Sequence, residues 1–186
     1  MPTFSPPRGF PCPWTTQFFA KDLPAIPRSK PRVFAEFESY FQLDDRDLRV
    51  ALKPGYVPFV LLQDIPGHYG WTPATGDEIW LSRTFIQELE AALPPQKVPR
   101  NPDRYAPSEL EEKLLLILEA TTLHELVHYY RKKSDAAVNL RSTKGRGFEE
   151  ALAREFERKA YGSLPTVQSL GIEKYMPKTA KGASKE

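Results

Sequence analysis

One uninterrupted stretch, residues 108–133, constrains the fold of this chain more than any other part of its sequence. It contains neither glycine nor proline. Ser108 and Glu111 at its start form a capping-box pattern, in which each side chain bonds the backbone N–H of the other residue. Apolar residues then continue through its middle, at 114–118, 120, 123, 126 and 127. The stretch therefore predicts one helix of about 25 residues at the centre of the fold.

The 186-residue chain has the composition of one folded domain, with 40% hydrophobic and 27% charged residues. Its net charge of +2 gives no basis for a nucleic-acid partner. The longest apolar runs, 57–62 and 114–118, fall far short of the roughly 20 residues that span a bilayer, so we expect no membrane span. The single cysteine, Cys12, excludes a disulfide framework and a cysteine-rich zinc site. The first ten residues lack the basic and apolar regions of a signal peptide, so we expect cytoplasmic synthesis.

Residues 1–32 hold eight of the 19 prolines, together with five aromatic residues. Because proline removes a backbone donor and fixes φ, we expect neither a regular helix nor a central strand there. The aromatic residues favour an extended arm that packs on the surface of the domain, and a linker or a delivery segment are the alternatives. The chain is thus divided into this arm, a domain at 33–173, and a lysine-rich tail at 174–186 that we expect to be frayed.

The rest of the chain predicts an α+β fold, with a small, mostly antiparallel sheet packed on the long helix. A second helix is predicted at 148–161, ended by Gly162. The other expected elements are a strand or short helix at 33–41, a hairpin of strands at 48–52 and 56–64, a loop at 65–77, a strand at 78–82 and an amphipathic helix at 85–93.

The predicted long helix carries the sequence His124-Glu125-Leu126-Val127-His128, an HExxH motif. Residues four apart lie one above the other on a helix face, so both imidazoles can bind one Zn²⁺ at about 2.0–2.1 Å. Glu125, one step round the helix, can reach a metal-activated water without binding the metal, which suits a general base. A chance HExxH in a chain of this length is an event on the order of one percent. A surface helix with two histidines and an ion-pairing glutamate is the alternative.

A catalytic zinc site needs a third protein ligand and an open position. The pattern HExxHxxGxxH is absent, because Arg131 and Ser134 occupy the positions of its glycine and last histidine. His68 lies in a predicted loop far upstream, where a solvent-facing side chain is the simpler expectation. The helix at 148–161 offers carboxylates instead.

Two neighbouring glutamates, Glu149 and Glu150, compete for this third position. A helical wheel places Glu149 on a mostly apolar face, with Leu152, Ala153, Phe156 and Ala160. A buried charge is costly unless a cation such as Zn²⁺ neutralises it. Glu150 shares a more polar face, with Ala153, Arg154, Glu157 and Tyr161. The wheel therefore favours Glu149, with Glu150 as the alternative, although either carboxylate also suits the first turn of a helix.

HELVH on a long helix, followed by a glutamate on the next helix, resembles the gluzincin branch of the zincin metallopeptidases over residues 107–161. It is similar to bacterial HExxH toxin and effector peptidases, including those linked to type VI secretion spike proteins. The resemblance implies a zincin-like fold in which zinc is bound by His124, His128 and Glu149, with Glu125 as base. Gluzincins often carry an acidic residue four positions after the ligand glutamate, where this chain has Ala153. The resemblance further implies a protein or peptide substrate, a cognate inhibitor or immunity protein, and export by a specialised secretion system.

Other zincin features are assigned to less distinctive positions. The edge strand that pairs with an extended substrate is assigned to residues 78–82, which equally well only complete the sheet. Tyr129 and Tyr130 are expected to pack against the sheet. Cys12 is expected to be a packed or exposed lone thiol, with a cysteine switch as the alternative. Four residues are candidates for stabilising the oxyanion: Tyr161, Tyr175, Arg141 and Arg146.

Three hypotheses for the function follow from these features. The leading one is a zinc endopeptidase, in which Glu125 takes a proton from the attacking water and passes it to the leaving amine. The second is a zincin-fold binding or regulatory module without proteolytic activity. The third is a non-enzymatic interaction domain that uses the arm or the tail. Because residues 1–32 lie far from the motif in sequence, we expect them to be dispensable for metal binding.

Overall fold

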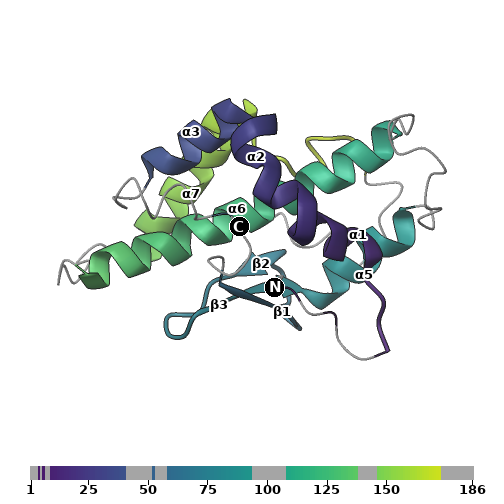
Figure 1. Cartoon of the computed structure of the whole chain (residues 1–186), viewed down its shortest axis with the longest axis horizontal. Coiled ribbons are helices and arrows are strands. Elements are labelled where there is room, and N and C mark those ends of the chain that lie inside the picture. The colour runs from purple at the N-terminus through teal and green to yellow at the C-terminus, as the bar shows by residue number, and fades with distance from the viewer. Residues whose placement is uncertain are drawn as a thin grey trace.

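The computed structural model describes residues 4, 6, 9–40, 52, 58–93, 108–137 and 146–172 of the chain. It confirms the α+β class: α6 runs through the middle, with a small sheet on one side and α2, α3 and α7 on the other (Figure 1). The elements in chain order are α1 (Pro13–Gln17), a π-helical turn η1 (Phe18–Asp22), α2 (Leu23–Ser29), α3 (Pro31–Ser39), β1 (Phe59–Gln63), β2 (Gly70–Trp71), β3 (Glu78–Ser82), α5 (Arg83–Ala92), α6 (Glu109–Ala137) and α7 (Arg146–Tyr161).

The sheet has the order β1-β3-β2, with β1 parallel and β2 antiparallel to β3. It is therefore mixed, and the expectation of a mostly antiparallel sheet is wrong for the described strands. The strand predicted at 78–82 is confirmed as β3, but it lies in the middle of the sheet, so its assignment as the edge strand is also wrong. The edge beside it is β2, two residues long, within the segment predicted as a loop. Of the hairpin predicted at 48–52 and 56–64, the turn and all of the first strand except Leu52 lie outside the described residues.

The long helix is confirmed as α6, which extends over 29 residues. Its capping box forms as predicted: the Glu111 N–H donates to the Ser108 hydroxyl at 3.3 Å, and the Ser108 N–H donates to the Glu111 carboxylate. Leu114, Ile117 and Leu123 are fully buried, because the helix packs between the sheet and the other helices. None of the described helices combines the length and apolarity that a membrane span requires.

The predicted extended arm is helical, so this expectation is wrong for its described part. Pro13 and Pro31 lie in the first turns of α1 and α3, after non-helical residues, where the missing N–H would have had no helical partner. Pro24 and Pro27 lie in α2, which continues from η1 without a break. The segment packs into the core rather than on its surface, through Phe4, Trp14, Phe18, Phe19, Leu23 and Ile26, each at most 7% exposed. A high proline count therefore does not exclude helices in this segment, because Pro13 and Pro31 occupy helix starts and α2 itself contains two prolines.

Residues 33–41 were predicted as a strand with a short helix as the alternative, and the helix α3 is what forms over most of them. Val33 and Phe37, four residues apart, are both buried on one helix face. The Phe37 ring meets Tyr130 of α6 at 6.3 Å and Phe156 of α7 at 6.1 Å between centroids. This contact with two helices fixes the position of α7, which supplies part of the site.

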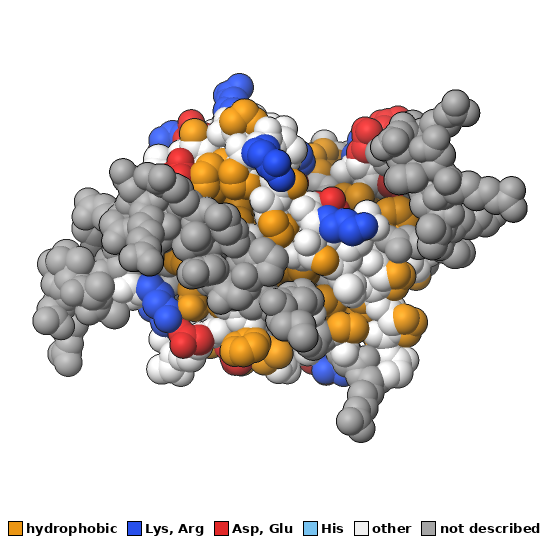
Figure 2. Space-filling model, viewed as in Figure 1, with side chains coloured by type: hydrophobic (Ala, Val, Ile, Leu, Met, Phe, Trp, Pro, Cys, Tyr) orange, Lys and Arg blue, Asp and Glu red, His pale blue; other side chains and the backbone are white. Residues whose placement is uncertain are grey.

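The face of the molecule drawn in Figure 2 shows no concentration of one charge among the described residues. On the face in Figure 2, Lys and Arg side chains lie scattered among apolar and uncharged groups. This agrees with the net charge of +2.

The helices predicted at 85–93 and 148–161 are confirmed as α5 and α7, and α7 ends before Gly162, whose φ of 80° is left-handed.

Candidate metal centre

The two histidines of the HExxH motif lie one turn apart on α6 and point the same way. Their Nε2 atoms are 3.2 Å apart. The side chains of His124 and His128 are 13% and 15% exposed. Because α6 is packed on two sides, the backbone that carries both rings is rigidly held.

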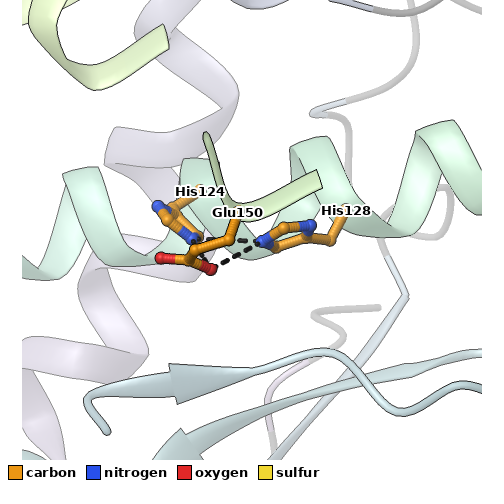
Figure 3. A group of neighbouring side chains, drawn as sticks. All are labelled: His124, His128 and Glu150. Carbon is orange, nitrogen blue, oxygen red and sulfur yellow. Dashed lines mark hydrogen bonds and ion pairs between the residues drawn. The ribbon is translucent and has the colours of Figure 1, made fainter. Parts of the chain in front are cut away.

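Helix α7 brings a carboxylate to this pair. The Oε2 atom of Glu150 lies 3.5 Å from the Nε2 atoms of both His124 and His128 (Figure 3). Ligand atoms about 2.0–2.1 Å from a tetrahedral zinc are about 3.3–3.4 Å from one another. The three separations match that value, so the three side chains fit one divalent cation. The Glu150 side chain is 42% exposed, so the group borders solvent on its α7 side.

The structure places Glu150 beside the imidazoles, where the helical wheel favoured Glu149. The buried stripe of α7 consists of Ala153, Phe156 and Ala160, whereas Leu152, counted as part of the apolar face, is only half-buried. On a regular wheel Glu149 is still aligned with that stripe, but the histidines lie beside the neighbouring flank of α7, which carries Glu150 and, two turns later, Glu157. The preference for Glu149 was therefore wrong as to which carboxylate faces the histidines.

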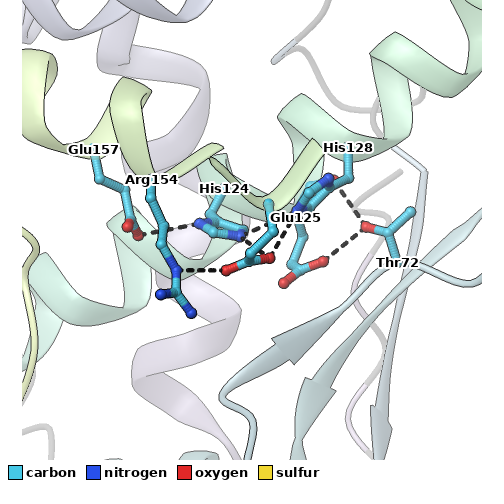
Figure 4. Close-up of polar contacts among 7 residues, drawn as sticks. Thr72, His124, Glu125, His128, Arg154 and Glu157 are labelled. Atoms are coloured by element: carbon cyan, nitrogen blue, oxygen red, sulfur yellow. Dashed lines mark hydrogen bonds and ion pairs between the residues drawn. The ribbon is translucent and has the colours of Figure 1, made fainter. Parts of the chain in front are cut away.

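A second carboxylate of α7 contacts the opposite side of the first imidazole. The Oε1 atom of Glu157 lies 3.4 Å from Nδ1 of His124, and the Glu157 side chain is 13% exposed (Figure 4). The expected acidic residue at Ala153 is absent, but Glu157, two turns after Glu150, supplies a carboxylate to a ligand-type histidine. Sequence reasoning missed this role, although the seven-residue spacing from Glu150 was visible and places both carboxylates on one helix face.

Glu150 is held from both of its oxygens. Its Oε2 faces the imidazoles, and its Oε1 accepts a hydrogen bond of 2.8 Å from Nε of Arg154. Burial alone lowers the pKa of His124, but the neighbouring carboxylates of Glu150 and Glu157 raise it to about 10. The imidazoles of His124 and His128 in turn hold the pKa of Glu150 well below its usual range. The carboxylates thus favour a positive charge at the imidazoles. A divalent cation bound by the group would supply that charge in place of the proton.

Glu125 lies beside this group and is 6% exposed. Burial raises the pKa of its carboxyl group, while His124 and His128 oppose the rise. The Thr72 hydroxyl lies 2.8 Å from its Oε2 and 2.9 Å from its backbone oxygen (Figure 4). A hydroxyl has one hydrogen, so against an ionised carboxylate it donates to only one of these oxygens at a time. No sequence pattern singled out Thr72.

Two sequence candidates lie apart from the centre. His68 is exposed in the loop before β2, where its ring lies 5.4 Å from that of Trp71. Cys12 is 2% exposed, and its Sγ lies 3.5 Å from the Phe10 carbonyl. Burial, reinforced by the Glu90 carboxylate, raises the pKa of this thiol to about 12. Cys12 is therefore the packed thiol, and not a switch.

The oxyanion candidates are not brought to the centre within the described residues. The Tyr161 hydroxyl donates to the buried carboxylate of Glu119 at 3.1 Å, at the far end of α7 from Glu150. Tyr175 and Arg141 lie outside the described residues, as does the side chain of Arg146. Tyr161 is therefore committed to a structural contact between α6 and α7.

The two tyrosines after the motif point in different directions. The Tyr129 hydroxyl donates to Asp77 at 3.4 Å, in the loop that connects β2 with β3. The Tyr130 ring packs against Phe37 of α3. The expectation that both pack against the sheet is therefore wrong for Tyr130.

Comparison with known proteins adds one finding. Residues 12–162 match the family model of metallopeptidase toxin 3, from just before α1 to just after α7. No curated protein and no solved structure matches the chain. The match covers most of the sequence, including every residue of the centre described above. The chain therefore belongs to the metallopeptidase toxin 3 family.

Proposed function

We propose that this metallopeptidase toxin domain is a zinc-dependent endopeptidase with Glu125 as its general base. The observation that carries this proposal is the convergence of His124, His128 and Glu150 with mutual separations of 3.2–3.5 Å. Two imidazoles and one carboxylate are a donor set of catalytic zinc sites. Zinc is proposed because hard ions such as Mg²⁺ and Ca²⁺ favour sites made of oxygen ligands alone.

When bound, the ion would polarise the scissile carbonyl and make the attacking water more acidic. Glu125 would accept the proton of that water and pass it to the nitrogen of the leaving amine. Burial favours this role, because it raises the pKa of Glu125 toward the range in which a carboxyl both accepts and returns a proton. Glu157 would hold the His124 ring in place through Nδ1, and Arg154 would hold Glu150 through Oε1.

The substrate is proposed to be a protein segment that binds in an extended conformation. A strand edge can pair with such a segment through backbone hydrogen bonds, and β2 is the described edge next to α6. The toxin description of the family supports export from the producing cell. We further propose a cognate immunity protein that blocks the site.

The test measures zinc and cleavage on the same preparations. We expect the zinc-loaded chain to cleave a proteome-derived peptide library, read by mass spectrometry. Glu125→Gln should keep one zinc per chain by elemental analysis and lose at least about 100-fold in cleavage rate. Glu112→Gln, an exposed glutamate earlier on α6, is the matched control and should change neither.

Three outcomes contradict the proposal in different ways. If the wild-type chain binds no stoichiometric zinc, the proposed metal site is wrong. A zinc-loaded wild type without cleavage favours a metal-binding module that is not a peptidase. If the Glu125→Gln variant keeps full activity, Glu125 is not the general base.

A further inference from the structure

Strand β2 lies against the motif face of α6 with alternating side chains. Gly70 pairs with buried Leu81, and Trp71 pairs with half-buried Trp80. Because successive residues of a strand point to opposite faces, positions 70 and 72 share the face toward α6, and Trp71 faces away. Position 70 and Thr72 therefore both meet Glu125.

Gly70 allows a backbone approach that any other residue would prevent. A Cβ atom at position 70 would lie 2.7 Å from Cγ and 2.8 Å from Oε1 of Glu125, and 2.9 Å from Cγ2 of Thr121. These separations are shorter than van der Waals contact allows. The backbone at Gly70 thus closes one side of the Glu125 carboxylate.

Thr72 fixes the other side of the same carboxylate. Its hydroxyl lies within hydrogen-bond distance of both Oε2 and the backbone oxygen of Glu125. With Oε1 against Gly70 and Oε2 against Thr72, rotation of the carboxylate about its side-chain torsions is opposed in both directions. Neither residue is part of the metal-binding group.

The loop after Thr72 is itself attached to α6. Lys132 Nζ donates to the carbonyls of Pro73 and Gly76, each at 3.1 Å, and Lys133 pairs with Asp77 at 2.6 Å. The strand that holds Glu125 is therefore anchored to the helix that carries it.

We propose that β2 and the residue that follows it, Thr72, are the positioning element of the general base, with Thr72 as the positioning residue. This inference rests on the proposed role of Glu125. Thr72 acts through Glu125 and not on the ion, so its loss should lower kcat while zinc content and KM stay the same. The edge strand would then align the base as well as border the substrate.

The activity test compares three variants of the full-length zinc-loaded chain. Thr72→Val keeps the shape and removes the hydroxyl, and we expect it to lower kcat about 10-fold. Thr72→Ser restores the hydroxyl and should recover most of that loss. Thr75→Val, at an exposed position of the same loop, is the control and should match the wild type. An unchanged kcat in Thr72→Val, an equal loss in Thr72→Ser, or a loss confined to KM or to zinc content overturns the proposal.

A second measurement needs neither metal nor activity. In the metal-free chain, the loss in Tm caused by Thr72→Val should be smaller in a Glu125→Leu background than in the wild type, because only the backbone contact of residue 125 then remains. Equal losses in both backgrounds overturn the proposal. If the wild type cleaves nothing, the proposed function fails. The comparison of Tm losses in the two backgrounds still shows whether Thr72 contacts the Glu125 side chain. If Glu125→Gln abolishes cleavage while Thr72→Val leaves kcat unchanged, the function stands and the positioning role fails.

Discussion

Glu157 contacts His124 on the ring nitrogen opposite the one that faces Glu150: its Oε1 lies 3.4 Å from Nδ1, while Nε2 lies 3.5 Å from Glu150. Both carboxylates come from α7 and stand two turns apart on one face. Together they hold the imidazole so that Nε2 points at the position between His128 and Glu150. A carboxylate on the outer nitrogen of a ligand histidine fixes its orientation and tautomer.

Glu157→Gln should therefore weaken zinc binding by about 10-fold or more, since loss of such a partner costs about 10–100-fold in metal affinity. The measurement is competition with a chelator of known affinity. Glu155→Gln is the matched control: it lies on the exposed side of α7, paired with Lys159 at 2.8 Å, and should not change the affinity. Equal affinities for Glu157→Gln and Glu155→Gln would show that the His124 contact is incidental.

The two neighbouring glutamates should differ sharply in their effect on zinc. Glu150→Ala removes the carboxylate that faces both imidazoles and should cut zinc affinity by at least about 100-fold, whereas Glu149→Ala should change it little. Chelator competition on both single variants decides between them. A larger loss in Glu149→Ala would restore the assignment that the helical wheel favoured.

The N-terminal segment should be required for folding. Removing residues 1–30 deletes the buried side chains of Trp14, Phe18 and Phe19, each contributing about 1.5–3 kcal/mol, against a total stability of about 5–15 kcal/mol. It also removes Thr15, whose N–H and hydroxyl both donate to Glu90 at 2.8 Å. We expect the shortened chain to show no cooperative thermal transition by circular dichroism.

A single substitution in the same segment tests one of its contacts without removing the whole segment. Lys30 pairs with the buried carboxylate of Glu119 at 2.7 Å, and Lys30→Met leaves Glu119 with the hydroxyl of Tyr161. We expect this variant to fold with about 1–2 kcal/mol less stability in urea unfolding.

The outcome that contradicts the deletion prediction is a chain without residues 1–30 that melts like the wild type. It would show that the segment is dispensable.

Cys12 should be unreactive in the folded chain. Its pKa is raised from 9.0 to about 12 by burial and by Glu90, so at pH 8 a thiol reagent should label the denatured chain and not the native one. Above pH 9 the unfolded chain ionises its thiol while the folded chain does not, so this group's contribution to stability is lost between about pH 9 and about pH 12. Cys12→Ala should remove that part of the alkaline decline in Tm. Rapid labelling under native conditions at pH 8 would contradict the burial of the thiol.

The sequence by itself determined the features that depend on neighbours within one or two helical turns. The capping box of Ser108 and Glu111, the start of α6 that it marks, and the alignment of His124 with His128 follow from local contacts and the 3.6-residue period of a helix. The position of Glu125 beside them follows from the same period. These features needed no knowledge of what packs against the helix.

Only the tertiary structure decided which residues from other elements meet that motif. Whether Glu149 or Glu150 faces the histidines depends on the rotation of α7 about its axis, which its packing on α6 and against Phe37 of α3 sets. The approach of Thr72 to Glu125, 53 residues apart, depends on the position of β2 in the sheet. Such contacts are selected by the free energy of burying whole faces, a sum over distant residues that no local pattern contains.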